Sequence, residues 1–126
     1  MKQYIIIVVA LVIIIFLNIW QTNYLKNTGR YLLSDINEID NSVQREDYES
    51  ALKGMAELEK TWQKIKNTWD VFGEHNDIEE INERIESMKV YAKYQDTEEF
   101  VNEYMLLQNL IEHIIESEQL NFGNVL

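Results

Sequence analysis

The feature that most constrains this chain is an apolar run close to its first residue. Residues 5–17 are thirteen positions without a polar side chain. In a helix, the distance from Tyr4 to Tyr24 is roughly 30 Å, which is the thickness of the hydrocarbon core of a bilayer. The run therefore predicts a transmembrane signal-anchor helix over residues 1–26.

Aromatic residues bracket this segment, with Tyr4 at one end and Trp20 and Tyr24 at the other. Aromatic rings at both ends are typical of a span whose rings lie at the two membrane interfaces. Residues 18–23 contain no pair of small residues for a signal peptidase, which disfavours a cleaved signal peptide. Two alternatives stay open: a cleaved signal peptide and a buried core helix of a soluble protein.

Positive charges on the two flanks of the span are nearly balanced. Lys2 lies before it, and Lys26 and Arg30 follow it. Because the tail before the apolar run is very short, as in signal-anchors, we expect the N-terminus inside and the domain outside the cytoplasm. The expected location is thus the cell membrane, with one pass.

The rest of the chain is strongly acidic. All 22 acidic residues lie at or after Asp35, and only eight Lys and Arg lie from Tyr31 onward. Such a charge repels phosphate backbones, so nucleic acid is not expected as a partner. The chain has no cysteine, which excludes disulfides and thiolate chemistry, and it has no proline and four glycines, which favours helices.

Four helical segments follow from the spacing of apolar residues. The first continues from the span to about Val43, with a possible break near Gly29. The second begins after Asp47, a residue type that caps helices, and ends at Gly73. Its apolar stripe includes Trp62 and Trp69, whose heptad spacing favours core positions over a partner-binding hot spot.

Capping-box spacings predict the starts of the other two helices. Asn76 stands three residues before Glu79, and Asp96 stands three residues before Glu99. We expect residues 121–124, which include a glycine, to end the last helix.

The predicted fold is all-α: an N-terminal transmembrane helix followed by an antiparallel three- or four-helix bundle over residues 27–126. Short connections place consecutive helices antiparallel, which makes a bundle the simplest solution. Asp47-Tyr48-x-x-Ala51-Leu52 also resembles the opening of a tetratricopeptide repeat, but the period of such repeats is absent.

Only two histidines are present, His75 before the third helix and His113 in the fourth. In an antiparallel arrangement they lie near the same end of the bundle, so together with nearby Glu residues they are candidate metal ligands. Capping or pairing with a carboxylate is the more common role of such histidines. No zinc-protease, di-iron, calcium-loop, nucleotide or hydrolase motif occurs, so we expect no catalytic residues, no cofactor and no enzyme.

Several short motifs together resemble a family of small, N-terminally membrane-anchored helical proteins of spore-forming Firmicutes whose domain has no known function. They are Asp47-Tyr48-x-x-Ala51, Trp62-x-Lys64-x-Lys66-x-x-Trp69, His75 with Glu79, Glu112-His113-Ile114 and Asn124-Val125-Leu126. The resemblance implies membrane attachment, a bacterial host and an integral membrane protein as partner. It implies no activity.

The function therefore stays unknown from sequence. The leading hypothesis is a non-enzymatic accessory or interaction protein of the cell envelope, whose partners are the lipid bilayer and another membrane or envelope protein. One alternative is an extracytoplasmic domain that senses a cation or small ligand. Another is a passive structural spacer.

Overall fold

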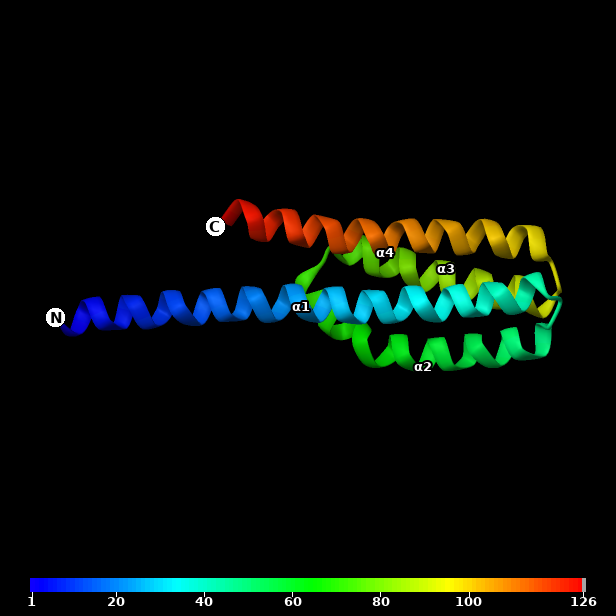
Figure 1. Cartoon of the computed structure of the whole chain (residues 1–126), viewed down its shortest axis with the longest axis horizontal. Coiled ribbons are helices and arrows are strands. Elements are labelled where there is room, and N and C mark those ends of the chain that lie inside the picture. The colour runs from blue at the N-terminus through cyan, green and yellow to red at the C-terminus, as the bar shows by residue number, and fades with distance from the viewer. Residues whose placement is uncertain (126) are drawn as a thin grey trace.

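The computed structural model describes the backbone of residues 1–125 and the side chains of residues 1–118. Over this part the chain forms four helices and no strand, which confirms the all-α prediction. The helices are α1 (Lys2–Gln44), α2 (Tyr48–Phe72), α3 (His75–Lys93) and α4 (Thr97–Val125). Figure 1 shows the first half of α1 projecting well beyond the other helices.

The four helices form an antiparallel bundle in which each packs against two neighbours. The contacting pairs are α1 with α2, α2 with α3, α3 with α4, and α4 with α1. The fourth member of the bundle is thus the second half of α1. Its buried residues begin at Leu25 and recur down one face. The boundary between residues 1–26 and 27–126 falls inside this continuous helix, so no linker separates the two parts.

Gly29 does not break α1. It is buried, and a side chain there would collide with Ile115 of α4 and lie 3.6 Å from Cη2 of Trp69. The missing side chain lets α1 and α4 approach closely. A single glycine lowers helix stability by only about 1 kcal/mol, which packing on both sides offsets.

Two of the predicted helix starts are confirmed. The Asp47 carboxylate accepts a hydrogen bond from the backbone N–H of Ser50 at 3.2 Å. Asp96 does the same for Glu99 at 3.3 Å. Each carboxylate satisfies one of the N–H groups that a helix start leaves without an internal partner. Gly73 is the C-cap of α2, as its sequence position predicts.

Two other predicted boundaries are wrong. The third helix begins at His75, one residue before the predicted cap Asn76, and its N-cap residue Glu74 makes no side-chain capping bond. The turn is tight, and its backbone N–H groups bond within the first turn: Asp77 and Ile78 both donate to the Glu74 carbonyl. Residues 121–124 do not end α4, which continues to Val125. Without proline, one glycine is too weak a signal to stop the helix.

Trp62 and Trp69 form the aromatic centre of the core. They are 1% and 0% exposed, and their rings meet edge to face with centroids 5.7 Å apart. Each indole N–H has a partner: Trp62 donates to the side-chain oxygen of Asn82, and Trp69 donates to the Thr28 hydroxyl at 2.9 Å. The two rings can therefore be buried without leaving a polar atom unsatisfied.

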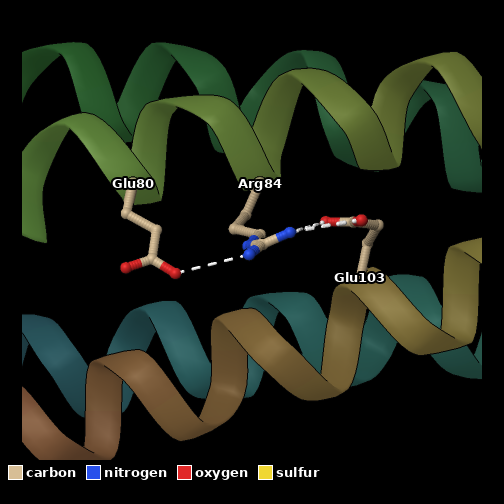
Figure 2. Close-up of polar contacts among 3 residues, drawn as sticks. All are labelled: Glu80, Arg84 and Glu103. Carbon is tan, nitrogen blue, oxygen red and sulfur yellow. Dashed lines mark hydrogen bonds and ion pairs between the residues drawn. The ribbon is translucent and has the colours of Figure 1, made fainter.

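One ion pair lies between α3 and α4. Arg84 Nη1 donates to both carboxylate oxygens of Glu103, at 3.3 and 3.0 Å, and Nη2 donates to Glu80 at 3.4 Å (Figure 2). The Glu103 side chain is only 12% exposed. A single guanidinium nitrogen thus bridges both oxygens of the Glu103 carboxylate, and such charge-assisted hydrogen bonds are stronger than bonds between neutral groups.

Candidate functional site

The apolar segment of α1 is bare. Every large hydrophobic side chain between Tyr4 and Trp20 is at least 41% exposed. The helix is long and apolar enough to cross a membrane, and none of its most apolar stretch is buried against the protein. Leaving such side chains in water instead of an apolar medium forgoes about 1.5–3 kcal/mol each. Summed over the segment, that exceeds the whole stability of a typical domain, about 5–15 kcal/mol.

Aromatic contacts join this segment directly to the end of the bundle. The Trp20 ring stacks on Tyr24 with centroids 5.5 Å apart and meets Phe72 edge-on at 5.9 Å. Trp20 and Tyr24 therefore touch both the apolar segment and the bundle, while Tyr4 lies at the opposite end of the segment. Phe72, the last residue of α2, is only partly buried because it faces Trp20 at the rim.

A polar contact clamps the same end. The Gln21 amide donates to the Glu118 carboxylate at 3.0 Å, which links α1 to the C-terminal part of α4. Partial burial raises the pKa of Glu118, and the bond from Gln21 partly opposes this. The depth of α4 relative to the apolar segment is thereby set by a contact between residues 97 positions apart.

Beside this clamp lies a cavity of about 300 Å³ at the bundle end. It is lined by residues of the end of α2, the α2–α3 turn, the start of α3 and the later part of α4: Phe72, Gly73, Glu74, Asp77, His113, Ile114, Ser117 and Glu118. Its wall combines one imidazole with several carboxylates. The sequence could not show this cavity, because its lining comes from segments about 40 residues apart.

The two histidines have different surroundings. His113 lines the cavity, whereas His75 bonds through Nδ1 to Asp70 at 3.1 Å and has Nε2 3.8 Å from Glu79. The hydrogen bond and the charge of Asp70 raise the pKa of the exposed His75 imidazole. Among the residues that the structure describes, no three His, Asp or Glu side chains are placed to hold a metal ion.

A second groove of about 300 Å³ runs between α1 and α2, away from the apolar segment. Its lining is mostly polar and acidic: Asp35, Glu38, Ile39, Ser42, Ser50, Lys53, Gly54 and Glu57. Burial, and to a lesser degree Glu38 and Glu57, raise the pKa of Asp35. The groove is a place where the fold keeps like charges close together.

No sequence pattern points to the residues that join the apolar segment to the bundle. Gln21, Phe72 and Glu118 have ordinary residue types at ordinary positions, and no motif includes them. Trp62 and Trp69 lie in the core, the position that their heptad spacing favours, and they present almost no surface to a partner.

Comparison with known proteins gives one family. The sequence profile of a family described as a domain of unknown function (DUF4363) matches residues 19–125. No match was found among proteins of curated function or among solved structures. The matched range begins where α1 first contacts the bundle, so it includes all four bundle helices and leaves out most of the bare segment.

Proposed function

The chain belongs to the DUF4363 family, and from this premise we propose that it is a non-enzymatic, membrane-anchored accessory protein of the bacterial cell envelope. The observation that carries the proposal is the bare apolar half of α1. A core helix in a soluble protein would be covered by its neighbours. This one continues into a well-packed bundle yet has no protein over its most apolar stretch.

The absence of a linker supports a role in presenting the bundle at a fixed position. The helix that crosses the membrane is also one of the four bundle helices. The stacking of Trp20 on Tyr24 and the bond from Gln21 to Glu118 brace it at the point of exit. The bundle then stands upright on the membrane, where a second membrane or envelope protein can contact its sides.

Charge indicates the kind of partner surface. The segment that forms α4 contains six Glu and no Lys or Arg, and its exposed acidic residues are Glu98, Glu99, Glu112 and Glu116. A basic surface on a neighbouring protein complements such a face, and contacts of this kind speed association and select partners. The same charge disfavours nucleic acid.

We further propose that the bundle lies outside the cytoplasm, the orientation expected of a signal-anchor. Protease added to intact protoplasts then digests the bundle, whereas a bundle on the inner side survives until the membrane is opened. If a C-terminal tag stays intact in unbroken protoplasts, the bundle lies inside the cytoplasm and the proposed orientation is wrong.

The anchor is tested by two double variants with matched side chains. Val9→Arg/Val12→Arg places two charges in the apolar segment, and Val71→Arg/Val90→Arg places them on exposed bundle positions. Each arginine near the centre of a span costs about 2.5–3.5 kcal/mol of insertion free energy. We expect the first variant to leave the membrane pellet and the second to remain in it. Equal membrane retention of both variants would contradict the anchor.

The partner is tested by extracting the protein from native membranes in mild detergent. We expect a second membrane or envelope protein to co-purify, and a charge-reversed α4 face (Glu98→Lys/Glu112→Lys) to release it. Recovery of the chain alone and monomeric, before and after mild cross-linking, counts against an accessory role.

A further inference from the structure

The last turns of α4 extend past the rest of the bundle toward the membrane. Glu118 bonds to Gln21, the residue after Trp20, whose ring meets Phe72 at the end of α2. Beyond that contact α4 remains helical for seven more residues, to Val125. At about 1.5 Å per residue, this adds roughly 10 Å of helix. Figure 1 shows the end of α4, in red, reaching beyond the α2–α3 connection and alongside the blue half of α1.

The composition of these turns differs from the rest of α4. Residues 119–125 contain no charged side chain, and three of the seven are Leu, Phe and Val. The part of α4 before them contains all six of its Glu residues. The change from acidic to uncharged occurs at Glu118, the residue bonded to α1 at the exit of the apolar segment.

We propose that the final turns of α4, residues 119–125, enter the membrane interface beside the span and form a second contact with lipid. This rests on the proposed anchor, because α1 sets the depth at which α4 meets the bilayer. If the Trp20 and Tyr24 rings lie at the interface, an antiparallel helix that runs roughly 10 Å further must enter the headgroup layer. That layer is about 5–8 Å thick on each side of the hydrocarbon core and accepts apolar side chains together with hydrated backbone groups, so the last turn of α4 also reaches the edge of the hydrocarbon core.

A second lipid contact has a mechanical consequence. A domain held by one helix can rotate about the helix axis and tilt with it, whereas two contacts on adjacent helices fix which side of the bundle faces a neighbour. The acidic part of α4 then stands directly above the headgroups in a constant orientation.

The experiment uses the full chain in phosphatidylcholine vesicles. Because the chain has no cysteine, single-cysteine variants can each carry one environment-sensitive fluorophore. Gln119, Leu120, Asn121 and Phe122 are labelled in turn, since four consecutive positions cover every side of a helix. Val12→Cys serves as the control within the span, and Glu98→Cys serves as the control at the opposite end of the bundle.

We expect shallow doxyl-labelled lipid to quench at least one of the four α4 labels strongly, and to leave the label at position 98 bright. Iodide dissolved in the water should quench the label at position 98 strongly and the lipid-facing α4 label weakly. Deep doxyl-labelled lipid should quench the label at position 12. Each variant is first checked for unchanged helical content by circular dichroism.

The outcomes separate the two proposals. If the label at position 12 is quenched but all four α4 labels respond like the one at 98, the anchor stands and the second contact is overturned. Labels that resist both iodide and doxyl lipid show that protein covers the end of α4, which also overturns it. If the label at position 12 is not quenched, the anchor itself fails, and with it the depth on which the second contact depends.

Discussion

At the residue scale, the fold holds several carboxylates in places where ionisation is unfavourable. Burial raises the pKa of Asp35 above its ordinary value of 3.8, and Glu38 and Glu57 raise it further. A raised pKa means that the folded protein binds this proton more tightly than the unfolded chain does. The ionised form of Asp35 therefore lowers stability, and this loss grows as pH rises from 3.8 through the raised value.

We predict that Asp35→Asn increases the free energy of unfolding at pH 7 and that the increase disappears below pH 3.8. Urea unfolding of the fragment 19–126 at several pH values measures it. The matched control is Asp47→Asn, where bonds from Ser50 lower the pKa, so the native carboxylate stabilises above 3.8 and this stability is lost as pH falls. The two substitutions should thus act with opposite sign at neutral pH. If both substitutions change the free energy of unfolding in the same direction, the charges of the α1–α2 groove do not destabilise the fold.

The ion pair between α3 and α4 also acts at the scale of single residues. In Glu103→Ala, Arg84 keeps only its longer bond to Glu80, and its Nε is already buried without a partner. We predict a loss of about 1–3 kcal/mol in the free energy of unfolding. The double variant Arg84→Met/Glu103→Leu removes both charges and should lie within about 1 kcal/mol of the native protein. Chemical denaturation compares the two variants. If the double variant is as unstable as Glu103→Ala, the loss does not come from leaving the Arg84 charge without its partner.

At the element scale, helix starts differ in what satisfies their first N–H groups. Asp47 accepts the Ser50 N–H at the start of α2, while α3 begins without a side-chain cap. We predict that Asp47→Ala costs about 0.5–2 kcal/mol. Asn76→Ala, which removes the cap that the sequence suggests, should change stability by less than about 0.5 kcal/mol. Thermal unfolding of both variants checks this, and a loss at Asn76 as large as at Asp47 would mean that α3 begins later in solution.

At the scale of the whole molecule, α1 belongs to two environments at once. Leu25 is 1% exposed in the bundle, and Trp20 and Gln21 contact the end of the bundle next to the apolar segment. We predict that fragment 19–126 folds as a soluble bundle. Fragment 27–126 loses Leu25 and should be less stable by about 2–5 kcal/mol, the range for removing a buried leucine side chain.

A fragment that begins at residue 45 lacks a whole side of the bundle and should not unfold cooperatively, because α2 and α4 would each expose the face that α1 covers. Circular dichroism with urea titration distinguishes the three fragments. Equal stability of fragments 19–126 and 27–126 would show that the contacts between α1 and the bundle end carry little energy.

Much of the fold follows from the sequence because the signals act over one or two helical turns. The apolar run before residue 20 and the stripe that includes Trp62 and Trp69 are periodic patterns. The caps at Asp47 and Asp96 depend on a residue three positions away. Helix number, helix type and the bare segment are of this local kind.

The tertiary structure decided what depends on contacts between distant segments. The bond from Gln21 to Glu118, the edge contact of Trp20 with Phe72 and the close approach of Gly29 to Ile115 join residues 52 to 97 positions apart, counted along the chain. They determine how deep α4 extends along α1 and which rings lie at the rim. No local pattern encodes them, because the same helices could pack in another register with their apolar stripes still covered, and only the fit of particular side chains selects one.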